Sequence, residues 1–387
     1  MAHPSRADRS RLSEWWWTID KSLLAAALAL IAAGFFLSLS SSPAATARLK
    51  IDNPFYFMER HAMFAVLTVI VLVGVSALSP RWAKRLCLVG LAGTLVILLA
   101  LPFVGFSAKG STRWLALGGF LLQPSEFLKP FFVVVTAWLF AEGQRQRDVP
   151  TTAIAIALFG LCATLLIIQP DFGQTVLLAT VWAAMFFLAG ISLWIVGLLG
   201  GLGVAGAVGA YTFIPHVTTR FDRFITGAGD NFQVDRGFQA IESGGWLGRG
   251  PGEGLVKRGL PDSHTDFIFS VAAEEYGIIV VMGLVAVFFF IMLRGLFHAM
   301  RERDRFVQLA VAGLVLQFGL QATINICVNL QLAPAKGMTL PFVSYGGSSM
   351  VAVAIGMGLV LALTRRRSES LRRLDVRIRP ATNMVPA

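Results

Sequence analysis

Five residues in one stretch of the chain could together bind an anion. Two cations and an aromatic residue, Lys109, Arg113 and Trp114, precede the acid and base Glu126 and Lys129. Arg and Lys bind phosphate through charge-assisted hydrogen bonds, so the cluster predicts a site for an anionic headgroup, above all a phosphate. Because Glu126 and Lys129 are three positions apart in the first turn of a predicted helix, pairing with each other is their structural alternative.

A second candidate is Asp266, in the stretch His264-Thr265-Asp266-Phe267-Ile268-Phe269, where a long polar loop runs into a long apolar segment. An ionisable side chain at the edge of a membrane span is costly, and its presence there indicates a functional site. Capping the N-terminus of the helix that follows is the structural alternative.

Polar residues also recur at helical spacing inside the same apolar segment. Asp266, Ser270 and Glu274 are four positions apart and are predicted to share one helix face. Glu275 occupies the next position. Structural pairing with a buried cation, or protonation, is the predicted state of Glu274 and Glu275.

A later apolar segment carries a stripe of amides, Gln317, Gln321, Asn325 and Asn329, again four apart. Contact with lipid would penalise these side chains, so the stripe must face protein or a watery cavity. Two interpretations stay open, since the amides could bond neighbouring helices or line a cleft.

The composition identifies the elements that must position these residues. Of 387 residues, 56% are hydrophobic and only 14% are charged, which excludes a soluble domain and indicates a polytopic membrane protein. The net charge of +11 is carried mostly by short loops and a C-terminal tail, so membrane topology explains it better than nucleic acid. The three cysteines lie in apolar runs and predict neither disulfides nor a metal site.

The fold class predicted is an all-α polytopic membrane protein with ten transmembrane helices, since each helix needs roughly 20 apolar residues. A cytoplasmic N-terminal segment (1–22) precedes a transmembrane domain (23–364), and a basic cytoplasmic tail (365–387) follows it. The predicted spans are 23–40, 61–79, 85–106, 125–142, 151–168, 173–189, 191–214, 266–293, 306–330 and 348–364.

The distribution of Lys and Arg places both termini in the cytoplasm. The longer connections, 107–124, 215–265 and 331–347, then fall on the outer side, which is the predicted working face. In the largest of them, the glycines from Gly248 to Gly254 predict tight turns and close backbone approach, with phosphate binding as the alternative.

Several motifs, taken together and in order, resemble the SEDS family of bacterial shape, elongation, division and sporulation proteins over about residues 20–365. Within the family, the amino-acid sequence around 250–269 is most similar to that of the division members, with the elongation members as the alternative. The motifs are Lys109-Gly110-Ser111-Thr112-Arg113-Trp114, Gln123-Pro124-Ser125-Glu126, Gln169-Pro170-Asp171-Phe172-Gly173, Pro261-Asp262-Ser263-His264-Thr265-Asp266-Phe267-Ile268-Phe269, Glu274-Glu275-Tyr276-Gly277 and Pro341-Phe342-Val343-Ser344-Tyr345-Gly346-Gly347-Ser348-Ser349.

The resemblance implies a peptidoglycan glycosyltransferase that polymerises lipid II at the outer face of the cytoplasmic membrane, during septal wall synthesis. It carries the catalytic role onto Asp266, as general base. The residues predicted to bind substrate are Lys109, Arg113, Trp114, Glu126, Lys129, His264, Lys336 and Ser344, and those predicted to be structural polar residues are Asp171, Glu274 and Glu275.

No metal ligand is predicted, although the pyrophosphate of the substrate makes a divalent cation, Mg²⁺ or Mn²⁺, a candidate cofactor. The partners implied are a class B penicillin-binding protein of the FtsI type, which is a transpeptidase, and other membrane proteins of the divisome. A flippase for the lipid-linked precursor is the rival function, because polar residues inside ten spans could move a headgroup across the membrane. A scaffold that only recruits a transpeptidase would leave Asp266 without a role.

Overall fold

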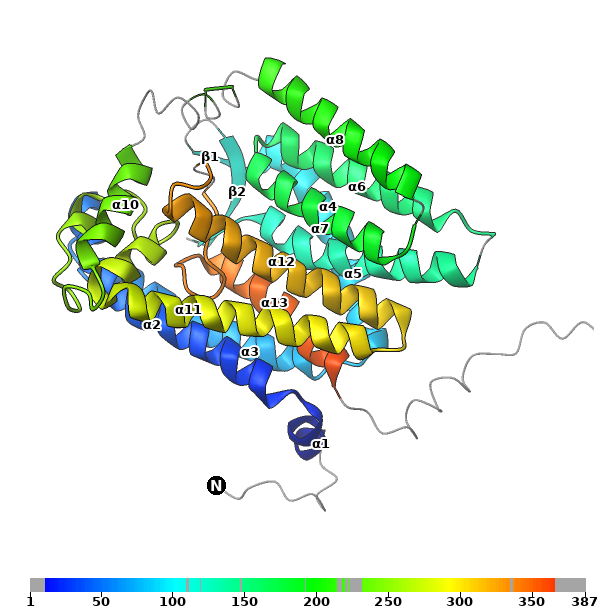
Figure 1. Ribbon diagram of the computed structural model, residues 1–387, viewed down its shortest axis with the longest axis horizontal. Coiled ribbons are helices and arrows are strands. Elements are labelled where there is room, and N and C mark those ends of the chain that lie inside the picture. Colours follow the sequence, from blue (N-terminus) through cyan, green and yellow to red (C-terminus); the bar gives the residue numbers. More distant parts are fainter. Residues whose placement is uncertain are drawn as a thin grey trace, which may run out of the picture.

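The computed structural model describes residues 11–108, 111–118, 120–146, 148–191, 193–213, 218, 219, 222, 232–334 and 337–365. Long helices run roughly side by side, and the shorter elements of the connections 107–124 and 215–265 gather at one end of the bundle (Figure 1). The elements are α1 (Arg11–Thr18), α2 (Lys21–Leu49), α3 (Tyr56–Ser76), α4 (Pro80–Val104), β1 (Phe106–Ala108), β2 (Ser111–Leu117), β3 (Phe120–Leu122), α5 (Pro124–Arg145), α6 (Thr151–Ile168), α7 (Phe172–Leu188), α8 (Leu193–Phe213), α10 (Phe232–Gly244), the 3₁₀ helix η1 (Val256–Gly259), α11 (Ile268–Arg301), α12 (Arg305–Asn329) and α13 (Gly347–Thr364).

The apolar helices confirm a multi-pass membrane protein. Within the described residues, eight helices are long and apolar enough to cross a membrane, namely α2 to α6 and α11 to α13. The apolar helix α7 is shorter, at 17 residues, and α8 coincides with the predicted span 191–214. Helices therefore overlap every predicted span, while the count of ten membrane crossings stays a prediction.

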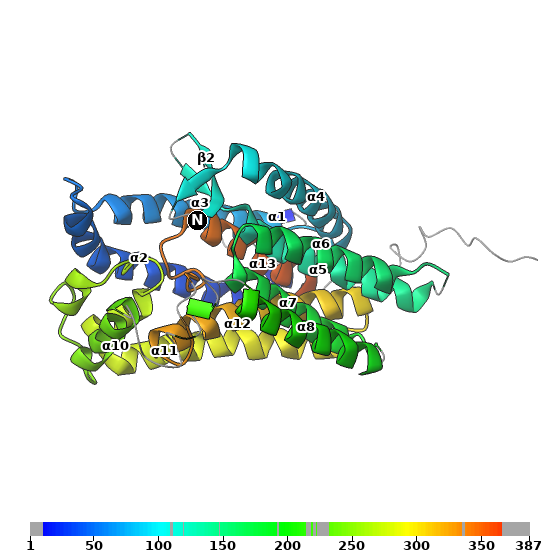
Figure 2. The same cartoon turned by 90° about the horizontal axis from the view of Figure 1, so that it is seen from above.

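Helix α5 lies at the centre of the bundle and contacts α4, α6, α7, α12 and α13. Its sequence is apolar on nearly all sides, and a helix of that kind is stable only where neighbours cover it. Helix α13 packs between α3 and α12, as the view in Figure 2 shows, and α8 lies at the margin of the bundle against α7. Four polar residues of α5, Ser125, Glu126, Lys129 and Thr136, are consequently enclosed by protein and shielded from lipid.

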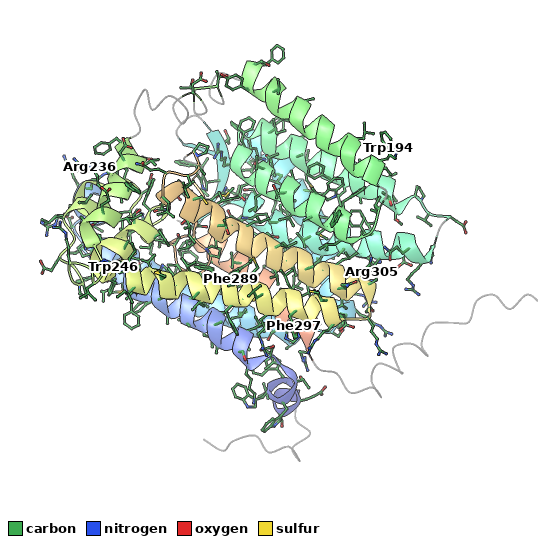
Figure 3. All side chains as sticks on the ribbon, in the orientation of Figure 1. Trp194, Arg236, Trp246, Phe289, Phe297 and Arg305 are labelled. Carbon is green, nitrogen blue, oxygen red and sulfur yellow. The ribbon has the colours of Figure 1, made fainter. Side chains whose placement is uncertain are left out.

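The connections predicted to lie on the outer side contain more secondary structure than the sequence predicted. The predicted loop 107–124 contains a three-stranded antiparallel sheet, in the order β1-β2-β3. The predicted loop 215–265 contains α10 and η1, and part of it lies outside the described residues. Figure 3 shows Arg236 of α10 and Trp246 at one end of the bundle and Arg305 at the other.

Helix α11 is broken at Gly277, which has φ 78° and ψ 174°. The turn that follows α10 repairs the break: the amides of Arg249 and Gly250 donate to the carbonyls of Glu274 and Glu275, and further along the amides of Ile278 and Ile279 donate to the carbonyls of Gly245 and Trp246. Backbone groups freed by a break at membrane depth need such partners.

The glycines of this turn allow the close approach that the sequence predicted. A Cβ on Gly248 would lie 2.2 Å from the carbonyl oxygen of Glu275, and one on Gly277 would lie 2.3 Å from that of Trp246. Both glycines also have positive φ, which side chains rarely tolerate. Within the glycine run, Gly248 thus serves contact between backbones, whereas Gly254 approaches the side chain of Glu274.

The predicted shared helix face of Asp266, Ser270 and Glu274 is wrong in one respect. Helix α11 begins at Ile268, and Asp266 lies in the turn before it. That turn is closed by the amides of Thr265 and Phe267, which both donate to the carbonyl of Asp262, itself at φ 52°. A local turn therefore ends the polar loop two residues later than the apolar pattern indicated.

Candidate functional site

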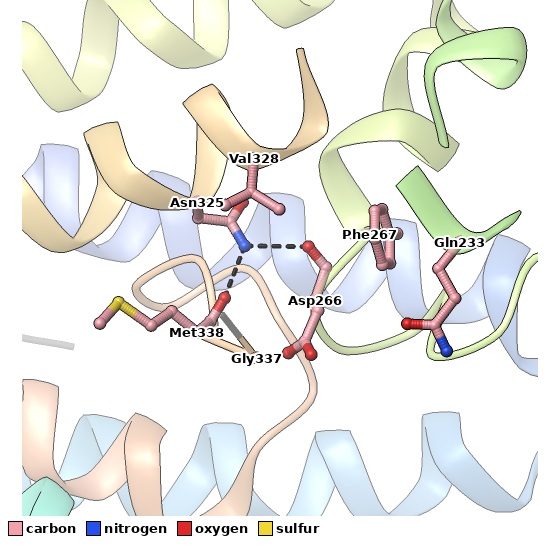
Figure 4. Close-up of a pocket in the computed structure, with 7 residues that line it drawn as sticks. All are labelled: Gln233, Asp266, Phe267, Asn325, Val328, Gly337 and Met338. Atoms are coloured by element: carbon pink, nitrogen blue, oxygen red, sulfur yellow. Dashed lines mark hydrogen bonds between the residues drawn. The ribbon is translucent and has the colours of Figure 1, made fainter. Parts of the chain in front are cut away.

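Asp266 lines a small cavity that is formed by four separate segments at one end of the bundle (Figure 4). Phe267 follows Asp266 in the turn before α11, and the other lining residues come from α10, from the last turns of α12 and from the connection between α12 and α13, namely Gln233, Asn325, Val328, Gly337 and Met338. The cavity measures about 30 Å³. That volume has room for roughly two water molecules, and Asp266 itself is partly exposed.

The amide stripe of α12 both bonds neighbouring segments and reaches this cavity. Asn325 donates to the carbonyls of Asp266, at 2.9 Å, and Met338, at 2.6 Å. Nearer the middle of the bundle, Gln321 donates to the carbonyl of Thr339 at 3.1 Å and accepts from Lys129 at 2.9 Å. Both interpretations left open by the sequence therefore hold at Asn325, whereas Gln321 bonds neighbouring segments without lining the cavity.

His264 lies close to Asp266 in the sequence but is not among the residues that line the cavity. Its ring packs 4.1 Å from the ring of Phe57 and 5.6 Å from that of Tyr345, measured between centroids. Burial disfavours the imidazolium and lowers the pKa of His264 to about 4, partly opposed by Asp262. The side chain is thus neutral at physiological pH, and its predicted contact with substrate stays a prediction.

Ser344 is buried beneath the segment that carries Asp266. Its hydroxyl donates to the carbonyl of Thr265 at 2.6 Å and accepts from the amide of Leu340 at 2.7 Å. Both bonds are made to backbone, so in this arrangement Ser344 holds two loops together.

Arg113 in β2 binds the junction between α6 and α7. Its Nε donates to the carbonyl of Gln169 at 2.9 Å, another guanidinium nitrogen donates to the carbonyl of Pro170, and a third lies 3.9 Å from Asp171. Trp114, its neighbour, pairs with Phe106 across the β1–β2 ladder. The predicted anion-binding side chain thus already contacts backbone oxygens.

Asp171 is buried beside this junction and accepts bonds from Gln123 and Ser125, both at 3.2 Å. Burial raises the pKa of Asp171, and the nearby guanidinium of Arg113 opposes that rise. Its contacts are all made to neighbouring protein groups, which is the arrangement expected of a structural polar residue.

Glu126 and Lys129 form an ion pair inside the bundle. The ammonium of Lys129 lies 2.8 Å from the carboxylate of Glu126, whose other oxygen accepts from Gln174 at 2.6 Å. Glu126 is 4% exposed and Lys129 is 1% exposed. The structure therefore contains the pairing that their spacing indicated, and their predicted role in substrate binding stays a prediction. Lys109 and Lys336 lie outside the described residues.

Glu274 and Glu275 join the first turns of α11 to the outer loop. The carboxylate of Glu274 accepts from the amides of Val256, at 2.7 Å, and Lys257, at 2.9 Å, at the start of η1. Glu275 forms a buried ion pair with Lys257, whose ammonium also donates to the carbonyl of Ser40 at 2.9 Å. Sequence reasoning did not single out Lys257, although two adjacent buried acids indicate that a buried cation must exist.

Gln233 is the other site residue that sequence reasoning missed. It comes from the first turn of α10 and faces the cavity beside Asp266 (Figure 4). No local pattern marks it, because its proximity to Asp266 depends on how α10 folds back over α11.

A divalent cation would need its own ligands. In the part of the chain that the structure describes, no group of three or more His, Cys, Asp or Glu side chains is placed to hold a metal ion. The cation therefore stays a prediction, and no step below depends on it.

Comparisons with known proteins agree with the motifs. A family model described as "Cell cycle protein", covering FtsW, RodA and SpoVE, matches residues 20–369. A protein of Caulobacter vibrioides named "Probable peptidoglycan glycosyltransferase FtsW" is 48% identical over 94% of this chain and 93% of its own length. A Thioalkalivibrio sulfidiphilus protein with the same name is 36% identical over 91% of each chain.

Two solved structures share the fold. A chain from a peptidoglycan synthase complex that coordinates polymerization and crosslinking aligns with a TM-score of 0.74 at 26% identity, over 90% of this chain and 98% of that one. The rod shape determining protein RodA of Thermus thermophilus aligns with a TM-score of 0.67, also at 26% identity, over 90% of this chain and 97% of its own. With a family model that matches most of its length, the chain belongs to the FtsW/RodA/SpoVE family of cell cycle proteins.

Proposed function

We propose that this protein polymerises lipid II into glycan strands at the outer face of the cytoplasmic membrane during septal cell-wall synthesis. Its curated relatives are named as peptidoglycan glycosyltransferases of the division type, FtsW. The observation that carries the proposal is the place of Asp266, which lines a cavity at the end of a membrane bundle that we predict to face outward. This is where a general base for a lipid-linked sugar would be needed.

In the proposed reaction, Asp266 takes the proton from a hydroxyl of the acceptor sugar. The hydroxyl oxygen then attacks the anomeric carbon of the donor from the face opposite the leaving group. The bond from that carbon to the pyrophosphate oxygen breaks, and undecaprenyl pyrophosphate leaves with the electron pair, which inverts the anomeric centre. One carboxylate suffices, because the leaving group needs charge stabilisation more than protonation.

Cations near the cavity would supply that stabilisation. Among the predicted ones, Lys336 directly precedes Gly337, which lines the cavity. Lys109 precedes β2 in the outer sheet, and Arg113 lies within that strand. Lys129 is neutralised by Glu126 in the present arrangement, so its charge is available to the pyrophosphate only if that pair separates.

The cavity beside Asp266 is small compared with the acceptor sugar. A space of about 30 Å³ is smaller than a sugar ring, and we propose that Gln233 of α10 or the connection at Gly337 moves aside when an acceptor reaches Asp266. Movement of the outer loop is thus part of the proposed cycle, as in enzymes whose loops close over their substrates.

We further propose that the protein is located at the division septum with both termini in the cytoplasm. A class B penicillin-binding protein would crosslink the strands that it makes. A structurally similar chain belongs to a complex that couples polymerization with crosslinking, which supports a partner of this kind. Other divisome membrane proteins are proposed as further partners.

The test is polymerisation of labelled lipid II by the purified protein with its transpeptidase, comparing wild type with Asp266→Asn. Asp262→Asn is the matched control, since it makes the same chemical change in the same turn, at a φ that Asn tolerates. We expect Asp266→Asn to bind lipid II and make no glycan, and Asp262→Asn to polymerise. Normal polymer from Asp266→Asn would overturn the assignment of the base. If folded wild type makes no polymer while an active control enzyme does, the transferase function itself is wrong, and a lipid II flipping assay is the next measurement.

A further inference from the structure

The main chain of Asp266 is held by two side chains of α12. The Nδ2 groups of Asn325 and Asn329 donate to its carbonyl oxygen, at 2.9 Å and 3.0 Å (Figure 4 draws the first). Asn325 is 2% exposed and Asn329 is fully buried. A carbonyl oxygen has two lone pairs, so both acceptor positions of Asp266 are occupied by the same helix.

The two preceding carbonyls are held as well, from a different segment. The carbonyl of His264 accepts from the amide of Tyr345 at 2.9 Å, and that of Thr265 accepts from the hydroxyl of Ser344 at 2.6 Å. Three consecutive peptide groups therefore accept bonds from outside their own segment. A turn between a loop and a helix is ordinarily much less restrained than this.

The chemistry of the neighbours fixes the orientation of both amides. The Oδ1 of Asn329 accepts from the backbone amide of Ser270, at 3.3 Å, and from its hydroxyl, at 2.7 Å. A backbone amide can only donate, so Nδ2 of Asn329 must face the carbonyl of Asp266. Asn325 lies between the carbonyls of Asp266 and Met338, and only its Nδ2 fits there.

Asn329 also performs the task of a helix cap for α11. The N-cap residue is Phe267, whose side chain has no hydrogen-bond acceptor. The amide of Ser270, in the first turn, needs an acceptor from elsewhere, and Asn329 of α12 provides it. The start of α11 and the carbonyl of Asp266 are thus bonded to one side chain.

We infer that Asn325 and Asn329 are positioning residues that fix the direction of the Cα–Cβ bond of Asp266, and thereby the reach of its carboxylate, by holding its main chain. The inference rests on the proposed function of Asp266 as the general base. A base must lie within hydrogen-bond reach of the hydroxyl that it deprotonates. With the carbonyl and the following helix turn both held, the Cα–Cβ bond of Asp266 has one direction. A misplacement of about 1 Å can cost a hundredfold in rate.

The test replaces each asparagine by leucine, which is similar in size but donates no hydrogen bond. Gln317→Leu is the matched control, because Gln317 belongs to the same buried stripe of α12, two turns from Asn325 and towards the opposite end of the bundle. Polymerisation of lipid II is measured with the full protein and its transpeptidase. Turnover is expressed per folded molecule that binds lipid II.

We expect kcat to fall about tenfold or more in Asn325→Leu and Asn329→Leu, with KM within about twofold of wild type. Gln317→Leu should change neither. A purely structural role would lower the melting temperature and the folded fraction but leave the turnover of each folded molecule unchanged. Turnover within twofold of wild type in both leucine variants would overturn the inference.

Ser344→Ala serves if the leucine variants do not fold. It removes one hydroxyl, which donates to the neighbouring carbonyl of Thr265, and should lower kcat at least threefold with KM unchanged. Asp266→Asn is measured alongside. If Asp266→Asn is inactive while every one of the three substitutions that folds leaves turnover unchanged, the positioning inference fails and the base stands. If Asp266→Asn polymerises normally, both fail together.

Discussion

Lys257 and Glu275 form a buried ion pair that joins the outer loop to α11 two residues before its break at Gly277. Lys257 is 3% exposed and Glu275 is 1% exposed. The ammonium also donates to the carbonyl of Ser40, so it connects α2, α11 and η1 at one point. Removing only one partner of an ion pair as deeply buried as this one strongly destabilises the folded protein.

We therefore expect Lys257→Met to lower the free energy of unfolding by about 3–5 kcal/mol, because Glu275 would be left buried and unpaired. The double variant Lys257→Met/Glu275→Leu should recover much of that loss. Thermal unfolding of the purified protein in detergent measures both. The exposed neighbour Arg258→Met is the control and should stay within about 0.5 kcal/mol of wild type. A single variant as stable as the control would contradict the pairing.

Gly277→Ala should be destabilising by about 1–3 kcal/mol, since its backbone conformation is one that side chains rarely adopt. The added Cβ would also meet the carbonyl oxygen of Trp246 at 2.3 Å and disrupt the bonds that repair the break. Gly283→Ala, in the same helix with open space around it, is the control and should be neutral or slightly stabilising. Equal melting temperatures for the two variants would argue against a required break.

Replacing Lys129 by Met leaves Glu126 buried without its cation, and we expect a loss of about 3–5 kcal/mol. The double variant Glu126→Gln/Lys129→Met should be considerably more stable than the single one, which thermal unfolding would detect. The same pair tests the predicted role in substrate binding. If that role exists, the folded double variant binds lipid II weakly even though its melting temperature is restored. Normal lipid II binding by that variant would assign the pair to structure alone.

The burial of His264 predicts a loss of stability in mild acid. Its pKa is lowered to about 4 in the folded protein and is about 6.5 when unfolded, so between these values the unfolded chain binds more protons. Stability should fall as pH decreases from 6.5 towards 4. The charged or titratable groups facing it are Asp262, Arg48 and Tyr345.

A series of melting temperatures from pH 7.5 to pH 5 measures this effect, with His264→Phe as the comparison. Phenylalanine can keep the packing against Phe57 but does not titrate. The difference between wild type and variant should widen in the acid range, to the disadvantage of wild type. If the melting temperatures of wild type and His264→Phe changed in parallel with pH, protonation of His264 would not destabilise the folded protein.

The membrane helices could be predicted from the sequence because apolar length is a local property. Helices overlap the predicted spans throughout, and α6 has the predicted bounds, Thr151–Ile168. The start of α11 was misplaced, since the turn around Asp262 depends on a positive φ that hydropathy does not reveal. The paired spacing of Glu126 and Lys129 was also visible in the sequence, whereas their burial depends on which helices surround α5.

Only part of the site could be predicted, because several of its contacts join residues that are distant in the sequence. Asp266 was marked by a charge at the edge of an apolar segment, which needs no knowledge of neighbours. The contact of Asn325 with Asp266 spans 59 positions, and Gln233 meets Asp266 through the fold of α10. The amide stripe gave the right side chains but could not distinguish bonding from lining, because both occur and the partners are distant in sequence.

The repaired break in α11 fixes one end of α10, the helix that contributes Gln233 to the cavity. Four backbone hydrogen bonds join the turn after α10 to both sides of Gly277, so the C-terminal end of α10 is held in place. The opposite end of α10 carries Gln233. Near it, the side chain of Gln331 donates a hydrogen bond to Asp235 at the surface, at 3.0 Å. A movement of α10 that enlarges the cavity would therefore begin at the end that carries Gln233, while the hydrogen bonds across the break in α11 stay intact.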